Sequence, residues 1–306
     1  MAAVVVTYRR RRLAGDVVRS LLDTEGVAPS HVVVVVNAEG GLDDPDLEDR
    51  VAMHRLATNV GPAGAFRHGL VEVFSDPAIE WAYLCEDDVG LFDLPAPRLG
   101  EVLARLQGAE APSPVGAVVA YGRRFAAHGG HTVNTVPDPG GPGDMAPVDV
   151  ACWGATLVHR SVVAAGVLPD PAWFFGYEDF DFFCRVRAAG FTVLVDAAAA
   201  RAVADQQTTR GRAAALSPHR PVDADESWRA YYVARNFLTF ARRHGTASWW
   251  AWHLAYSLRR LQLAGSGPER AAYLHGLWDG ARGRLGFNPR YQSRRGELPV
   301  PGPDRR

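Results

Sequence analysis

Three consecutive carboxylates, Glu86, Asp87 and Asp88, come directly after the apolar run at residues 81–85. Like charges this close together at the end of a buried strand are costly unless a positive partner neutralises them. Carboxylate oxygens suit Mg²⁺ or Mn²⁺, especially when a bound diphosphate completes the coordination shell. The triplet therefore predicts a divalent metal site, with a solvated acidic turn as the alternative.

A second acidic cluster lies far downstream, in the aromatic-rich segment 174–185, and contains Glu178, Asp179 and Asp181. A carboxylate in such a setting is a candidate general base, because it can take a proton from a hydroxyl group. Asp181 and Arg185 stand four residues apart on a predicted helix, so an ion pair between them is the structural alternative for Asp181.

The first half of the chain must supply the elements that position these carboxylates. Apolar or β-branched runs typical of strands occur at residues 4–7, 32–36, 53–56, 81–85 and 115–120. Stretches with the apolar spacing of helices lie between them, at 17–22, 70–74 and 99–106. This alternation predicts an α/β fold with a mainly parallel central sheet covered by helices on both faces.

Ligands of such sheets bind at the carboxyl ends of the strands, which is where Thr7, Asn37 and the acidic triplet fall. Four arginines at 9–12 directly follow the first predicted strand. They either face a diphosphate or form a solvated basic turn.

The turn at 59–65, which contains Gly61 and Gly64, stands between a predicted strand and a predicted helix. It matches neither the Walker loop nor the dinucleotide fingerprint. It is either a turn that needs a permissive backbone or a place where the backbone approaches a nucleotide near a helix N-terminus.

Composition limits the class of protein. The chain has 306 residues, is 47% hydrophobic and 22% charged, and has a formal net charge of −1, which gives no support for nucleic-acid binding. Its three cysteines lack metal-ligand spacing and are expected to be reduced core residues. The N-terminal apolar run precedes its arginines, so no signal peptide is expected, and no apolar stretch is long enough to cross a bilayer. We therefore expect a cytoplasmic protein, either free or peripheral at the inner face of the plasma membrane.

Taken in order, these segments resemble glycosyltransferase family 2, inverting enzymes with the GT-A fold, over residues 3–240. The resemblance lies in Val-Val-Thr-Tyr-Arg-Arg at 5–10, Asn-Val-Gly-Pro-Ala-Gly-Ala at 59–65, Glu-Asp-Asp at 86–88, Cys-Trp-Gly-Ala at 152–155 and Phe-Phe-Gly-Tyr-Glu-Asp-Phe-Asp-Phe-Phe-Cys-Arg at 174–185. Segments 231–236 and 276–286 are similar to the C-terminal parts of the rhamnosyltransferase and galactofuranosyltransferase branches.

The resemblance implies a hexosyltransferase that uses Mg²⁺ or Mn²⁺ and moves a sugar from a UDP- or dTDP-sugar to an acceptor hydroxyl. It implies Asp179 as the general base beside Glu178, and Asp88 as the metal ligand with Glu86. The implied donor contacts are Thr7, Tyr8, Arg10, Asn37, Asn59, Gly61, Gly64, Glu86 and Asp87. The implied acceptor contacts are Trp153, Gly154, Tyr177 and Asp181, with segment 152–155 as a strand that forms the acceptor wall.

The chain departs from the family pattern at three places. Val36 precedes Asn37 where the family has an aspartate, and Glu86 stands first in the triplet in place of an aspartate. The family's histidine ligand after the last strand is absent, so Asp205 or His219 is the candidate replacement. These departures keep open a degenerate relative that serves as a binding or scaffold subunit. A sugar-nucleotide pyrophosphorylase is less favoured, because the glycine-rich loop with Arg and Lys that it needs is missing.

We predict a catalytic domain at 1–215, a helical extension at 216–297 and a disordered tail at 298–306. The extension holds predicted helices at 228–241, 249–263 and 270–285, rich in Trp, Tyr and Arg. These helices either pack on the catalytic domain, form a homo-oligomer or contact a membrane surface. Segment 129–147 is rich in Gly and Pro and is predicted to be a lid or a connecting loop.

Overall fold

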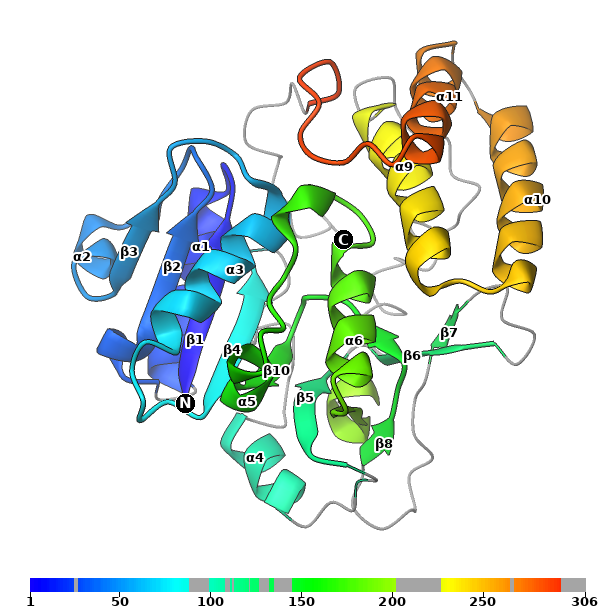
Figure 1. Ribbon diagram of the computed structural model, residues 1–306. Helices are drawn as coiled ribbons and strands as arrows, with labels where there is room; N and C mark the ends of the chain where they lie inside the picture. The colour runs from blue at the N-terminus through cyan, green and yellow to red at the C-terminus, as the bar shows by residue number, and fades with distance from the viewer. Residues whose placement is uncertain are drawn as a thin grey trace, which may run out of the picture.

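The computed structural model describes residues 1–24, 27–87, 99–107, 111, 113–120, 122–126, 132–134, 145–201, 227–264 and 267–292. Within these residues, eight strands form one mixed sheet in the order β3-β2-β1-β4-β10-β5-β11-β8, and three form a small sheet in the order β7-β6-β9 (Figure 1). The strands are β1 Ala2–Thr7, β2 Val32–Val36, β3 Ala52–Arg55, β4 Trp81–Glu86, β5 Val115–Val119, β6 Gly122–Phe125, β7 Thr132–Asn134, β8 Met145–Pro147, β9 Val150–Ala151, β10 Thr156–His159 and β11 Thr192–Asp196.

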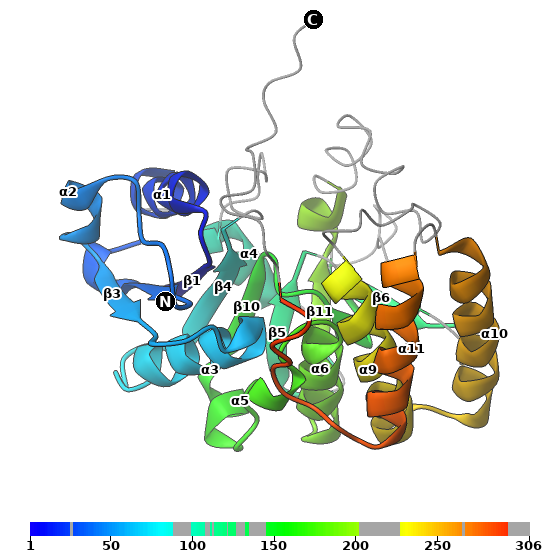
Figure 2. The ribbon, with the colours of Figure 1, turned by 90° about the horizontal axis from the view of Figure 1, so that it is seen from above.

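Helices cover both faces of the large sheet, and three more form a group at the C-terminal end of the chain (Figures 1 and 2). The α-helices are α1 Arg11–Arg19, α2 Pro45–Glu48, α3 Gly61–Val73, α4 Leu99–Gln107, α5 Arg160–Ala164, α6 Glu178–Ala188, α9 Ser227–His244, α10 Ala247–Leu263 and α11 Gly267–Ala281. A π-helix, η1 Ser20–Thr24, follows α1, and short 3₁₀ helices are η2 Pro29–His31 and η4 Pro171–Trp173. The predicted α/β architecture, a large central sheet flanked by helices with a helical C-terminal region, is confirmed.

The sheet is more mixed than the apolar runs predict. Strands β3, β2, β1 and β4 are parallel neighbours, and β11 pairs with β5 in parallel. Between these two groups β10 runs antiparallel to both β4 and β5, and β8 is antiparallel to β11 at the sheet edge. An apolar run shows that a strand is buried on both faces but not in which direction it runs.

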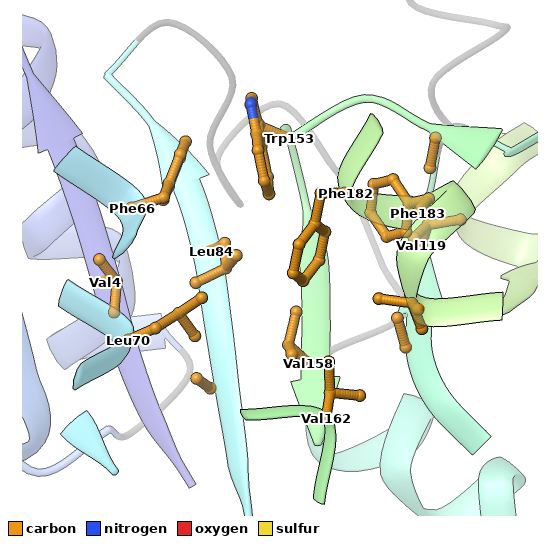
Figure 3. Close-up of a cluster of buried hydrophobic side chains, with 14 of the residues drawn as sticks. Val4, Phe66, Leu70, Leu84, Val119, Trp153, Val158, Val162, Phe182 and Phe183 are labelled. Atoms are coloured by element: carbon orange, nitrogen blue, oxygen red, sulfur yellow. The ribbon is translucent and has the colours of Figure 1, made fainter. Parts of the chain in front are cut away.

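Two apolar layers hold the helices against the sheet. On one face, Phe66 and Leu70 of α3 and Phe182 of α6 form one apolar cluster with Val4 and Leu84 of the strands, with Phe182 beside Val158 of β10 (Figure 3). On the other face, α1 and α4 pack against the opposite sides of the same strands, through Val17, Val18, Leu99 and Val102. Every residue of the all-valine strand β2 is buried, because it lies between two helical layers. The carboxyl ends of β1, β2 and β4 therefore lie at one rigid edge.

Two sequence predictions about local structure are wrong in part. Segment 152–155, predicted as a strand, is the turn between β9 and β10, and Ala155 has a positive φ of 55° there. The segment 129–147, predicted to be irregular, contributes the strands β7 and β8. Its remaining residues lie outside the described ranges, so the prediction of a lid stays a prediction. The predicted domain boundary at 215 and the tail at 298–306 lie outside these ranges too.

The C-terminal helices α9 and α10 differ in how much of their surface is packed against the rest of the protein. Helix α9 is buried along one face and packs against α11 and the start of α6. Helix α10 buries Trp249 but leaves a line of apolar side chains exposed, namely Trp250, Leu254 and Leu258. In the described part of the chain, no helix combines the length and the apolar character that crossing a membrane requires.

Candidate active site

The carboxyl ends of three neighbouring parallel strands meet at one edge of the large sheet. Thr7 at the end of β1 lies opposite Val36 of β2, and Val6 lies opposite Glu86 of β4. The residues that follow these ends are Tyr8, Asn37 and Asp87. The parallel register therefore gathers the side chains that the sequence assigns to donor binding.

Asp87 is held by three donors from the end of β1. Its carboxylate accepts hydrogen bonds from the Thr7 hydroxyl at 2.8 Å and from the Tyr8 backbone N–H at 3.2 Å. The Arg10 guanidinium lies 3.0 Å from its other oxygen. Asp87 is only 5% exposed, so this arginine supplies positive charge that a buried carboxylate requires. Asp88 lies outside the described residues, and its predicted role as a metal ligand stays a prediction.

Two asparagines connect the end of β2 to the start of α3. The Asn37 amide donates to Asn59 at 2.9 Å and accepts from the backbone N–H of Val60 at 2.9 Å. Asn59 accepts in turn from the backbone N–H of Gly61 at 2.9 Å. Both amide side chains, predicted to contact the donor, therefore also cap the otherwise unpaired N–H groups where α3 begins.

Gly61 allows α3 to begin against the loop that leads to α6. Its φ is +74°, and a Cβ atom placed on it would lie 2.0 Å from the carbonyl oxygen of Phe174. At Gly64 a Cβ would meet the Val60 side chain at 2.6 Å. At both glycines, therefore, two parts of the protein approach each other closely. This agrees with the first alternative given for the turn at 59–65, a turn that needs a permissive backbone.

The loop before α6 has an unusual backbone. Phe174, Gly176 and Tyr177 have φ angles of 61°, 79° and 66°. A positive φ in a bulky residue is strained and persists only where the surroundings enforce it. Outside this loop, the other non-glycine residues with positive φ among the described ones are Arg9, Ala38 and Ala155. All of them lie where strands end or begin at this edge of the sheet, so backbone strain is concentrated around the candidate site.

Helix α9 supplies the donors that enforce this loop conformation. The Asn236 amide donates to the carbonyl oxygens of Trp173, Phe175 and Gly176 at 2.8, 2.7 and 2.9 Å. Its neighbour Arg235, 1% exposed, donates to the Trp173 carbonyl at 3.0 Å. Because these carbonyl groups precede α6 directly, α9 determines where the first turn of α6 points.

Glu178 and Asp179 occupy that first turn. Glu178 is 5% exposed, and its Oε2 atom has no hydrogen-bond partner within the part of the chain that the structure describes. Burial, together with the charges of Asp179 and Glu86, raises the pKa of Glu178 well above its usual range. Burial also raises the pKa of Asp179 to about 6, although its carboxylate accepts a hydrogen bond from the Phe180 N–H at 2.8 Å. Adjacent carboxyl groups with raised pKa values are typical of proton-transfer sites.

Two residues near this pair have no individual role assigned from the sequence, although Cys152 belongs to the segment 152–155 that the resemblance places at the acceptor. The Cys152 thiol donates a hydrogen bond to Asp179, and burial beside that carboxylate raises the pKa of the thiol. The positive charge of Arg123 on β6 favours the ionised form of Asp179. In the sequence Cys152 has the features of a core cysteine, and Arg123 lies in a short strand of the small sheet with no preceding motif. The resemblance of segment 152–155 is the one sequence signal near Cys152, and no sequence signal points to Arg123.

Asp181 forms the ion pair with Arg185 that the sequence offers as its structural alternative, and its role as an acceptor contact stays a prediction. Its side chain is fully buried and bonds to Arg185 at 2.8 Å, His244 at 2.9 Å and Arg243 at 3.4 Å. Burial alone would raise its pKa, but the bonds from His244 and Arg185 lower it below the usual range. Asp181 therefore ties α6 to the end of α9.

The other predicted acceptor residues surround the start of α6 and β10. Trp153 packs between Phe66 and Phe182, with ring centroids 4.9 and 5.2 Å away. Figure 3 shows its indole nitrogen at the end of the ring farthest from Val158, and this nitrogen has no hydrogen-bond partner among the described residues. Gly154 is buried beside it, and Tyr177 is partly buried with its ring against Phe240 of α9. The Trp153 nitrogen is the polar atom of this group that still requires an acceptor.

The structure does not test the candidate metal ligands. Glu86 is partly buried at the end of β4, whereas Asp88, Asp205 and His219 all lie outside the described residues. Of the three cysteines, Cys85 is buried as a core residue, whereas Cys152 and Cys184 are only partly buried.

Comparisons with known proteins give fold-level likenesses of limited extent. No family model matches the chain, and no curated protein matches its sequence. Among solved structures, a crystal structure of GalNAc-T7 with UDP, GalNAc and Mn²⁺ overlaps with a TM-score of 0.47 at 12% identity, over 65% of this chain and 43% of that one. The structure of A197 from STIV overlaps with a TM-score of 0.35 at 12% identity, over 64% of this chain and 81% of that one. The chain thus spans less than half the length of the first of these proteins, and overlaps this weak assign no activity to it.

Proposed function

We propose that this protein is a metal-dependent inverting glycosyltransferase of family 2, with the GT-A fold and closest to the rhamnosyltransferase and galactofuranosyltransferase branch. It would move a sugar from a UDP- or dTDP-sugar to a hydroxyl group of a glycan, a glycolipid or a natural product. One observation carries the proposal. The acidic end of β4 and the acidic start of α6 are near enough that the charge of Glu86 contributes to the raised pKa of Glu178.

The chemistry of an inverting transfer needs groups on two sides of the sugar carbon. A carboxylate must accept the proton of the attacking hydroxyl while the diphosphate leaves on the opposite side. Asp179 suits the first task, because it is only partly buried and has a pKa of about 6. Glu178 is more deeply buried and keeps its proton more strongly, so we assign it to orienting the acceptor.

The carboxylates at the end of β4 fit a divalent cation. The resemblance to family 2 names Glu86 and Asp88 as the side chains that would hold Mg²⁺ or Mn²⁺, next to Asp87, which receives three hydrogen bonds. One or two carboxylates together with substrate phosphates is a usual binding mode for Mg²⁺. When bound, such an ion stabilises the negative charge of the leaving diphosphate. Arg10 adds a fixed positive charge at the same strand end.

Nucleotide release from a panel of UDP- and dTDP-sugars tests this function. With Mn²⁺ present, at least one donor should be hydrolysed slowly even without an acceptor, because water can replace the acceptor hydroxyl. Chelation with EDTA should stop the release, and added Mn²⁺ should restore it. An Asp88→Ala variant should lose nucleotide-dependent Mn²⁺ binding and turnover but retain the wild-type unfolding temperature. Full turnover in EDTA would contradict the proposal, and nucleotide binding without any turnover would favour a scaffold subunit.

We also propose that the exposed line on α10 contacts a membrane surface at the inner face of the plasma membrane. Trp250, Leu254 and Leu258 are 38%, 64% and 56% exposed, and Arg259 is exposed next to them. Aromatic and aliphatic side chains beside a cation suit the interface of an anionic bilayer. The protein should therefore sediment with vesicles that contain an anionic lipid, and Leu254→Ser with Leu258→Ser should weaken this binding. If the protein instead forms a concentration-dependent dimer and does not bind vesicles, the exposed side chains of α10 contact a second copy of the chain.

A further inference from the structure

A group of side chains that could hold a metal ion lies between α3 and the edge strand β3. His54 of β3 and His68 of α3 face each other, with Nδ1 of the first 3.1 Å from Nε2 of the second. Glu72 completes the group, and one ligand atom from each of the three residues lies within 4.8 Å of the others. Each of the three side chains is only partly buried, so an ion from solution has access.

The fold brings the three residues together by two simple periodicities. His68 and Glu72 are four residues apart on α3, so they lie on one face of the helix, one turn apart. Side chains alternate along a strand, and Ala52 of β3 packs in the same apolar layer as Phe66 of α3. His54 stands two residues after Ala52, and it therefore points to the same side, toward the helix.

The geometry points to a transition-metal site, and we propose that His54, His68 and Glu72 bind Zn²⁺. Two imidazole nitrogens that share a tetrahedral Zn²⁺ at about 2.05 Å are separated by roughly 3.3 Å, close to the distance observed here. Two imidazoles and one carboxylate suit Zn²⁺ and related ions far better than Mg²⁺. Three protein ligands leave the fourth position to water.

A simple hydrogen bond between the two histidines is the competing explanation. Such a bond accounts for the 3.1 Å separation, and the spacing of four residues on α3 accounts for Glu72 beside His68, but these are two unrelated causes. A divalent ion accounts for all three side chains at once, because it replaces the shared proton and attracts the carboxylate. The ion would connect β3 to α3, the helix whose first turn is capped by Asn59.

This site is independent of the proposed transferase activity. Its ligands are two imidazoles and the Glu72 carboxylate, on β3 and α3, whereas the proposed catalytic ion is held by carboxylates at the end of β4. Its test therefore needs no substrate. The full-length protein is stripped with EDTA, dialysed, and titrated with Zn²⁺ and with Co²⁺ by calorimetry and by visible absorption.

We expect one Zn²⁺ to bind per chain, to raise the unfolding temperature and to resist displacement by excess Mg²⁺. Co²⁺ should give the intense visible bands of a four-coordinate site. His68→Ala should weaken Zn²⁺ binding by more than 100-fold, since loss of even an outer-shell partner weakens metal binding by about 10–100-fold. Glu72→Gln retains the shape of the side chain and should weaken binding by at least about 10-fold. The control His31→Gln removes a histidine at the end of η2, outside the group, and should leave binding unchanged.

Two results would overturn the proposal. One is the absence of a Zn²⁺-dependent rise in unfolding temperature in the wild type. The other is equal Zn²⁺ affinity in the wild type, Glu72→Gln and His68→Ala, which would place any bound Zn²⁺ elsewhere. If His68→Ala does not fold, Glu72→Gln and His54→Gln decide the question, because both replacements preserve side-chain size.

Discussion

An Asp179→Asn variant is expected to bind the sugar nucleotide as the wild type does and to transfer the sugar about 10²–10⁴-fold more slowly. The amide preserves the shape of the side chain and its acceptor for the Phe180 N–H, but it cannot take a proton. Donor binding is expected to survive, because the proposed donor contacts lie at the ends of β1, β2 and β4 and at the start of α3, and not on α6. Steady-state transfer rates with a fluorescence titration of the nucleotide measure the two properties separately.

The pH dependence of the wild type provides a second measure of the same residue. A base with a pKa of about 6 is protonated below that pH, so the transfer rate should fall as the pH is lowered through 6. Because Glu178 is adjacent, the apparent value belongs to the pair. The Asn variant should lack this inflection.

Stability distinguishes a catalytic role from a structural one. The native pKa of Asp179 is raised above its usual range, so the folded state holds this proton more tightly than the unfolded chain does. Ionisation of Asp179 therefore lowers stability as the pH rises from about 4 to 6, and the cost persists above that range. Asp179→Asn removes this cost and should be at least as stable as the wild type at pH 7. A variant that transfers sugar at nearly the wild-type rate would contradict the assignment, and Glu178→Gln would then be the next test.

A Gly61→Ala variant is expected to lose roughly 3 kcal/mol or more of its free energy of unfolding. A left-handed backbone costs a residue with a Cβ atom about 1–2 kcal/mol, and the φ of Gly61 is +74°. In addition, the new methyl group would lie 2.0 Å from the Phe174 carbonyl oxygen, so one of the two segments must move. Urea denaturation followed by circular dichroism measures the loss.

Gly166→Ala is a matched control for this substitution. Gly166 has nearly the same φ, +79°, but a Cβ atom there would meet nothing within 4 Å. It should therefore lose only the backbone contribution, about 1 kcal/mol. The difference between the two variants isolates the contact with Phe174. Equal losses would show that α3 and the loop before α6 do not press on each other.

The part of the site that depends on parallel strands is predictable from the sequence. Runs such as 32–36, composed entirely of valine, indicate buried strands, and polar residues directly after such runs fall at the carboxyl edge of the sheet. Thr7, Asn37 and Asp87 follow this rule and lie together. The strand order places the ends of β1, β2 and β4 side by side, and the hydrogen bonds among these three side chains and their neighbours follow from that order.

The remaining features depend on contacts that no local pattern encodes. The direction of β10 is set by its partners β4 and β5, because its four residues have no periodicity of their own. Asp181 stands two residues after a candidate base in the sequence, yet two residues are about half a turn of helix, so its side chain points toward His244 and Arg243 instead. The partners of Asp181 on α9 stand 62 and 63 residues later in the chain, so no local pattern in the acidic cluster shows that this carboxylate is the paired one.

The three hydrogen bonds from Asn236 to the loop at 173–176 also have a consequence for the order in which the site forms during synthesis of the chain. The three acceptors precede Asn236 by 60 to 63 residues. At about 5–20 residues per second, a ribosome makes those carbonyl groups roughly 3–12 s before it makes their donor. Through that interval the β-sheet can already assemble from residues made earlier, whereas Glu178 and Asp179 exist without the helix that aims them. The scaffold of the site is therefore available to a nascent chain well before its acidic pair is in position.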